Sequence, residues 1–122
     1  MSKVVAVIGA SSNPQKFGNR AVRAFRRQGY TVVPINPNET EVEGLKTYPS
    51  VLDVPGPIDM ATVYVPPEIG ERVIEDIARK RIAEVWLNPG AESAALVARA
   101  RALDIKPILA CSIVGIGENP YR

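Results

Sequence analysis

The sequence predicts a doubly wound α/β fold, with about five parallel strands in one sheet and helices on both faces. Short apolar runs alternate with amphipathic helical patterns along the chain of 122 residues. The runs are almost uninterrupted, as strands buried on both faces require. No repeat or linker divides the chain, and its hydrophobic content of 46% is enough for one core, so we expect one domain over residues 1–122.

The first half of the chain is expected to form two strands around a helix. The helix carries the apolar residues Ala21, Val22 and Phe25 on one face, and Gly29 is placed to end it. Around it, apolar and β-branched runs predict the strands. The expected order is a strand at 4–8, a helix at 18–28, a strand at 30–35, a polar surface connection at 39–46, and a short strand with a helical turn at 48–54.

The second half repeats the alternation of strand and helix. Pro66 and Pro67 end one strand, and Pro67 lies near the first helical position, where its missing N–H costs little. Glycine and proline in the tail predict a loop. The expected order is a strand at 59–65, a helix at 68–81, a strand at 83–87, a helix at 92–103, a strand at 106–111 and a loop at 112–122. In the first of these helices the inward residues are expected to be Ile69, Val73, Ile74, Ile77 and Ala78, and in the second Leu96, Ala100 and Leu103.

The turn from Gly9 to Gly18 has the form of an anion site. It joins a strand to a helix through small and polar residues, which aims several backbone amides at one spot beside the positive end of the helix dipole. The chain has no acid before Glu39, whereas Lys16 and Arg20 lie close to this turn. A phosphate or pyrophosphate is therefore the expected ligand, and an ordinary turn with nothing bound is the alternative.

Four turns follow the carboxyl ends of the predicted strands. In a parallel sheet these ends meet at one edge, where ligands bind at the point at which the strand order reverses. Their convergence favours a binding site more strongly than any single motif. The four are the turn 9–18, Asn36-Pro37, Pro66-Pro67 and Asn88-Pro89-Gly90.

Two common nucleotide motifs are missing. A dinucleotide site would show G-x-G-x-x-G and an acid at the end of the second strand, but Gly9 is followed by Ala10 and Ser11, and the second strand ends in neutral Asn36. No Gly-Lys-Ser/Thr occurs, so a P-loop is excluded. An NAD site is the less favoured reading.

The ordered segments GASSNPQKFGNRAVRAFRRQGYTVVPINP, LKTYPSVLDVPGPIDMATVYVPPE and VWLNPGA resemble the small stand-alone CoA-binding proteins, which are similar to the CoA-binding domain of the succinyl-CoA synthetase α subunit. The resemblance covers residues 3 to about 111. It implies a Rossmann-like domain that binds the nucleotide end of coenzyme A, with the turn 9–18 at the phosphates, Asn36 and Pro37 at the adenine and ribose, Pro66, Pro67 and Ile69 as a wall, and Asn88, Pro89 and Gly90 closing the pocket. The cofactor-binding residues are expected to be Gly9, Ala10, Ser11, Ser12, Asn13, Lys16, Phe17, Gly18, Arg20, Asn36, Pro37, Pro66, Pro67, Ile69, Asn88, Pro89 and Gly90.

Individual side chains leave alternatives open. Lys16 is the first choice for a phosphate contact and Arg20 the second, although Lys16 is equally consistent with a solvated lysine. Ser11, Ser12 and Asn13 could donate to phosphate or cap the helix. The synthetase family has a basic residue shortly after the proline that ends the second strand; Asn38 and Glu39 stand there in this chain, so reading of the 3′-phosphate by that route is in doubt.

The residue inventory argues against catalysis. The chain has no histidine, which excludes histidine acid–base chemistry and a phosphohistidine relay, and its one cysteine makes a structural zinc site unexpected. Asp53, Asp59 and Glu118 have no motif partner and are interpreted as turn or surface acids, and Cys111 as a small buried residue.

The leading interpretation is a non-catalytic module that binds coenzyme A or an acyl-CoA. The alternatives are a small NAD(P)-dependent enzyme and an interaction scaffold without ligand. A net charge of +2 gives no reason to expect nucleic acid or a membrane as partner. Neither a signal peptide nor a long apolar segment is recognised, so we expect a cytoplasmic protein, with a homodimer or a partner protein left open.

Overall fold

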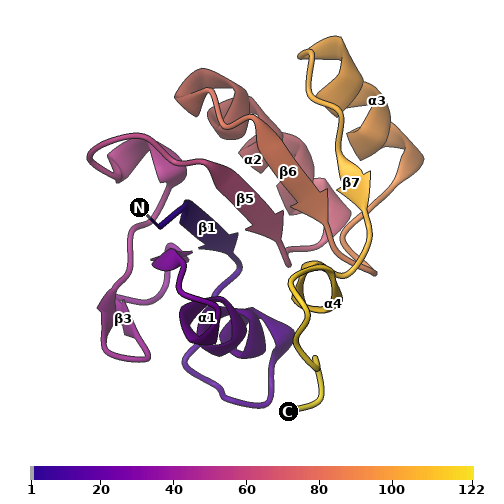
Figure 1. Ribbon diagram of the computed structural model, residues 1–122. Coiled ribbons are helices and arrows are strands. Elements are labelled where there is room, and N and C mark those ends of the chain that lie inside the picture. Colours follow the sequence, from indigo (N-terminus) through magenta and orange to yellow (C-terminus); the bar gives the residue numbers. More distant parts are fainter. Residues whose placement is uncertain (1) are drawn as a thin grey trace.

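A computed structural model, which describes residues 2–122, contains the predicted parallel sheet of five strands. The strand order is β2-β1-β5-β6-β7, so the first strand of the chain lies inside the sheet, between β2 and β5 (Figure 1). All four pairings in this sheet are parallel. The strands are β1 (Val4–Ile8), β2 (Thr31–Ile35), β5 (Met60–Val63), β6 (Glu84–Leu87) and β7 (Ile108–Leu109).

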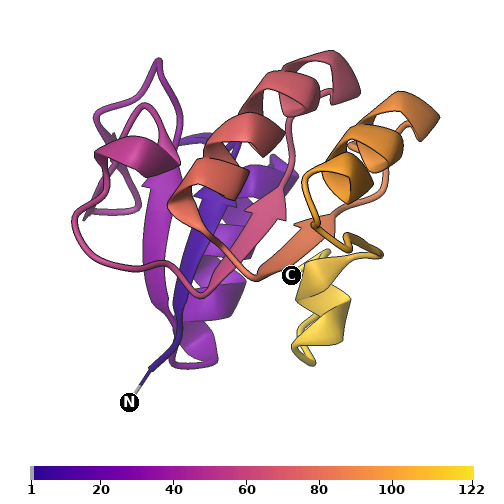
Figure 2. The ribbon, with the colours of Figure 1, turned by 90° about the horizontal axis from the view of Figure 1, so that it is seen from above.

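Helices cover both faces, which confirms the predicted fold class. Figure 2 shows α2 and α3 side by side on one face, and α1 lies with α4 on the other. Alternate residues of β1 enter the two cores: Val5 and Val7 pack with α1, whereas Ala6 and Ile8 pack with α2 and α3. The helices are α1 (Phe17–Arg27), the 3₁₀ helix η1 (Val51–Asp53), α2 (Pro67–Lys80), α3 (Ala94–Ala102) and α4 (Ser112–Gly115).

The predicted apolar face of α2 is confirmed except at its beginning. Pro67 is the first helical residue, as expected, and Ile74 and Ile77 are fully buried. Ile69 is 38% exposed, so the expectation that it faces the core is wrong. Ile69 lies in the first turn of the helix, and its side chain lines a cleft described below.

The segment predicted as a plain surface connection, residues 39–46, is a small hairpin. β3 (Glu41–Val42) pairs antiparallel with β4 (Leu45–Lys46). Val42 is fully buried against the α1 side of the core, which no polar connection would predict. Two-residue strands are too short for an alternating pattern, so the sequence shows no period there. The next segment fits its prediction, with a bridge between Ile35 and Tyr48 followed by η1.

Two expectations at the C-terminal end are wrong. The last strand was expected over residues 106–111, but β7 has only two residues, and both are exposed at the edge of the sheet. The tail was expected to be a loop, but it begins with α4, which buries Ile113 completely. Cys111, expected to be buried, is half-buried at the start of that helix.

The rest of the tail is held against α1 by Glu118, which is therefore not the surface acid that the sequence suggested. The Arg27 guanidinium lies 2.9 Å from its carboxylate, and Gln28 Nε2 donates to its second oxygen at 2.6 Å. These hydrogen bonds, with Gln28 first and Arg27 second, hold the pKa of Glu118 below its ordinary value of 4.5. Asp59 is also engaged, because it accepts from the Val4 amide at 2.7 Å.

The lowered pKa of Glu118 predicts a dependence of stability on pH. Its contribution is complete above the unfolded-state pKa and is lost as the pH falls through the lower folded-state pKa. At pH 7 we expect the free energy of unfolding, measured with urea, to be larger for the wild type than for Glu118→Gln. This difference should shrink as the pH falls below 4.5. A difference that stays constant from pH 7 to pH 3 would show that the carboxylate's charge is unimportant to the tail.

Among residues 2–122, no helix is long and apolar enough to cross a membrane.

Candidate functional site

The candidate site is a cleft at the carboxyl ends of the strands. The strand order reverses between β1 and β5, and there the predicted turns after β1, β2, β5 and β6 come together. The main part of the cleft has a volume of about 540 Å³. Its lining residues are Gly9, Ser11, Lys16, Phe17, Gly18, Asn36, Tyr64, Val65, Pro66, Pro89, Gly90 and Ala91.

A second, more apolar part of the cleft lies between the ends of β1 and β2 and the start of α2. It has a volume of about 290 Å³ and shares Gly9, Asn36 and Val65 with the main part. The shared residues make the two parts one continuous site. The further residues of this apolar part are Ile8, Ile35, Pro37, Asn38, Pro49, Ile69 and Val73.

Two glycines allow the turn after β1 to fold tightly against the start of α1. Gly9 has a φ of +92°, which residues with a side chain rarely adopt. A Cβ on Gly18 would clash with the carbonyl oxygen of Gly9. The amides of Gly9 and Ala10 both donate to the Ile35 carbonyl, at 3.0 and 3.3 Å, and so bind the turn to the end of β2.

The start of α1 opens into the cleft without a side-chain cap. Lys16 is the N-cap residue and makes no capping hydrogen bond. Ser11 and Asn13 were possible caps, but their side chains accept from the amides of Asn13 and Gln15 inside the turn. The first helical residues, Phe17 and Gly18, line the cleft, and the amides of a first turn have no partner within their own helix. This arrangement suits an anion.

Most of the predicted site residues are brought together, and some are not. Gly9, Ser11, Lys16, Phe17, Gly18, Asn36, Pro66, Pro89 and Gly90 line the main part, and Pro37 and Ile69 line the apolar part. Ala10 is fully buried beneath the turn. Lying outside both linings are Ala10, Ser12, Asn13, Arg20, Pro67 and Asn88.

Arg20, expected to contact phosphate, does not line the cleft and is engaged by the tail. Its Nη1 donates to the Pro120 carbonyl at 2.9 Å, and its guanidinium lies 5.1 Å from the centre of the Phe17 ring. Phe17 in turn meets Tyr121 edge to face, at 6.2 Å between ring centres. The tail therefore occupies Arg20, and Lys16 is the cationic side chain that lines the cleft.

Asn88 lies beneath the cleft. It is 2% exposed, its Nδ2 donates to Thr62 Oγ1 at 2.7 Å, and its Oδ1 accepts from the Ser112 amide at 2.8 Å. The Ser112 hydroxyl lies 2.7 Å from Thr62 Oγ1 and 3.2 Å from the Tyr64 hydroxyl. Burial raises the pKa of Tyr64 to about 12, so that this cleft residue is neutral at physiological pH.

Sequence reasoning missed the wall formed by Tyr64, Val65 and Ala91. The first two were assigned to the strand at 59–65, but β5 ends at Val63 and leaves them on the cleft. Their position directly before Pro66 was the available signal, since a proline cannot donate to a central ladder. In the part of the chain that the structure describes, no three acids, cysteines or histidines gather as metal ligands.

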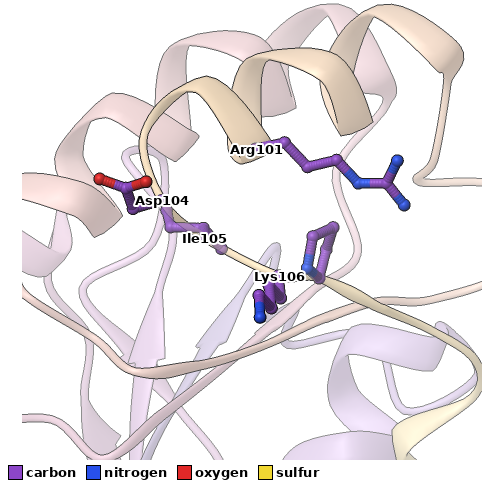
Figure 3. A pocket seen from close by; sticks show the side chains of 5 residues that line it. Arg101, Asp104, Ile105 and Lys106 are labelled. Carbon is purple, nitrogen blue, oxygen red and sulfur yellow. The ribbon is translucent and has the colours of Figure 1, made fainter.

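A second hollow, of about 530 Å³, lies near the start of β7, away from the carboxyl ends of the strands. It is not lined by the start of a helix or by turns that follow several strands. Arg101, Asp104, Ile105, Lys106 and Pro107 line it, between the end of α3 and the start of β7. Figure 3 shows the Arg101 and Asp104 side chains pointing away from each other, so they do not converge on one ligand group. The cleft at the carboxyl ends is therefore the better candidate.

Comparison with known proteins gives the family. A family model described as the CoA binding domain matches residues 3–116. An ADP-forming acetate–CoA ligase I of Archaeoglobus fulgidus is 40% identical over 80 residues, which are 66% of this chain and 12% of the ligase. An ADP-forming acetate–CoA ligase II of the same organism is 42% identical over 82 residues, again 12% of its length. The chain thus spans a small part of these ligases.

Solved structures of similar sequence have the same fold as this chain. A conserved hypothetical protein from Pyrococcus furiosus superimposes with a TM-score of 0.84 at 32% identity, covering 94% of this chain and 99% of that one. The dinucleotide-forming acetyl-coenzyme A synthetase 1 of Ca. Korarchaeum cryptofilum, in complex with phosphate and ADP, gives a TM-score of 0.77 at 32% identity. That match covers 88% of this chain and 25% of the synthetase.

Proposed function

The chain belongs to the CoA binding domain family, and from this premise we propose that it binds coenzyme A or an acyl-CoA through the nucleotide end of the ligand, without catalysing a reaction. The observation that carries the proposal is the uncapped start of α1, which meets Lys16 and an apolar wall in one cleft. A ligand with phosphate groups beside a purine has the matching chemistry.

The two parts of the cleft would take different groups of the ligand. The pyrophosphate would lie at the amides of Phe17 and Gly18, with Lys16 beside it. The adenine would lie in the apolar part, where Pro37 and Ile69 face the end of β1. The part of coenzyme A that links its pyrophosphate to its thiol would then pass along Pro66, Pro89 and Gly90.

The side chains of the cleft support a binding role more than a catalytic one. The ionisable groups among its lining residues are Lys16 and Tyr64. Burial raises the pKa of Tyr64 to about 12, so it is a poor base at neutral pH. The chain also has no histidine to act as general acid or base.

Isothermal titration calorimetry with coenzyme A, ADP and NAD tests the proposal. We expect coenzyme A to bind more tightly than NAD, because the cleft lacks the glycine fingerprint of dinucleotide sites. Tighter binding of NAD, or no binding of any of the three, would contradict the assignment. Native mass spectrometry of freshly purified protein is an independent check, since a retained ligand is identified by its mass.

Lys16→Ala is expected to weaken coenzyme A binding roughly tenfold, the scale of one hydrogen bond to a charged group. The loss should be smaller in high salt, because the contact is exposed and is screened. Lys106→Ala is the matched control, since it removes the same charge at the opposite edge of the sheet and should leave the affinity unchanged. Equal losses in both variants would show that only the overall charge matters.

A further inference from the structure

A carboxylate from the segment after β2 is hydrogen-bonded to the turn that we assign to phosphate. Glu39 Oε2 accepts a hydrogen bond from the Ser12 amide at 2.5 Å. The residues beside this pair line the cleft, with Ser11 in the main part and Asn38 in the apolar part. Glu39 is not itself a lining residue, but its carboxylate joins the segment after β2 to the turn after β1, next to residues that line both parts of the cleft.

The other oxygen of Glu39 is available to a ligand. Within residues 2–122, Glu39 Oε1 has no hydrogen bond or ion pair, and the residue is half-buried. Asn36, which follows β2, is neutral and already engaged, because its Nδ2 donates to the Ala10 carbonyl at 2.7 Å and its Oδ1 accepts from the Asn38 amide at 2.8 Å. Glu39 is thus a charged acceptor, with one oxygen unengaged, a few residues after the end of the second strand.

Two arginines of α1 are engaged by neutral oxygens and not by Glu39. Arg23 donates to the Pro14 carbonyl at 2.7 Å and to Asn19 Oδ1 at 2.8 Å. Arg26 donates to the Glu43 carbonyl at 2.8 Å. Neither arginine therefore forms an ion pair with Glu39, although the first part of the sequence is basic.

We propose that Glu39 is a specificity-determining residue, which makes the cleft prefer ligands of the CoA class whose adenosine ribose carries free hydroxyls over those with a ribose phosphate. The inference rests on the proposed function and names the form of nucleotide that the site favours. In dinucleotide-binding domains a carboxylate after the second strand accepts from ribose hydroxyls, whereas domains that take a ribose phosphate place an arginine nearby, and we apply the same chemistry to this cleft. A phosphate at that position carries about −1.5 to −2 charges and is repelled.

The test compares coenzyme A with 3′-dephospho-coenzyme A by calorimetry at one fixed ionic strength. For the wild type we expect the dephospho form to bind roughly three- to tenfold more tightly, the scale of a like-charge contact at a half-exposed site with a doubly charged phosphate. Glu39→Gln should bring the ratio close to one, because glutamine keeps an oxygen for the Ser12 amide and removes the charge. Glu39→Lys should reverse the preference.

Glu41→Gln is the matched control, since this exposed acid lies two residues further along, on β3, and its loss should leave the wild-type ratio unchanged. A wild type that binds coenzyme A at least as tightly as the dephospho form overturns the inference, and so does an unchanged ratio in Glu39→Gln. In both cases the proposed function stands, because a ligand binds. Failure of both ligands to bind the wild type overturns the proposed function and the inference together.

Discussion

Gly18→Ala is expected to destabilise the protein by about 3 kcal/mol, the upper range for a group forced into a packed site, and to abolish coenzyme A binding. The added Cβ would overlap the Gly9 carbonyl oxygen, which is a backbone atom fixed at the end of β1. Relief requires α1 to move away from the turn, and this movement removes the amides of its first residues from the cleft. Urea unfolding measures the first effect and calorimetry the second.

Gly70→Ala is the control for this change. Gly70 is also helical, but its Cβ would meet only the end of the Leu96 side chain, at 2.9 Å, and no backbone atom. That contact can be relieved by a small rotation, and alanine gains about 1 kcal/mol in helix propensity. We therefore expect a change within about 1 kcal/mol and full binding. An equal loss in both variants would mean that helix packing in general, and not the approach of α1 to Gly9, decides the outcome.

Asn88→Ala is expected to cost about 3 kcal/mol, because it leaves buried groups without partners at about 1 to 3 kcal/mol each. The change removes the acceptor of the Ser112 amide and the donor to Thr62 Oγ1 and to the Val63 carbonyl. The network joins β6 to β5 and α4, so the tail should loosen before the sheet unfolds. Hydrogen exchange of the Ser112 amide, together with urea unfolding, measures both effects.

Asn119→Ala is the matched control, because the side chain of this exposed asparagine accepts a hydrogen bond only from the Tyr121 amide, at 2.9 Å. Its loss should cost less than about 0.5 kcal/mol, as is usual for surface sites. A double-mutant cycle of Asn88→Ala with Thr62→Val then measures the coupling of the two side chains. Additive effects would contradict a connected network, since residues in contact couple by about 0.5 to 3 kcal/mol.

The parallel sheet and the edge that carries the site were predictable from the sequence. Buried strands such as residues 4–8 are apolar throughout, and the turns that follow parallel strands must share one edge. The hairpin at β3 and β4 and the helix α4 were not predictable, because elements of two or four residues are shorter than the period that reveals them. Val42 and Ile113 are buried through tertiary contacts, which local patterns do not record.

Within the site, backbone features were predicted better than side-chain directions. Gly9 and Gly18 lie where the turn requires them, since glycine is needed at a close approach. Not all basic residues of α1 contribute to the cleft. Arg20 and Arg27 are instead bound by the C-terminal tail, which is more than ninety residues away in sequence. A polar residue after a strand can bind a ligand or support the fold through hydrogen bonds. Asn88 is buried, and it supports the fold.

The position of β1 inside the sheet has a consequence for synthesis and folding. β1 is made first, but it must wait for β2 and β5 before both of its edges are paired. The last cleft turn, at Pro89 to Ala91, leaves the ribosome later still. A ligand that contacts all four turns therefore cannot bind a nascent or partly unfolded chain. At a hundredfold excess over its Kd it adds about 2.7 kcal/mol to the native state alone, so a rise in melting temperature reports assembly of the whole domain.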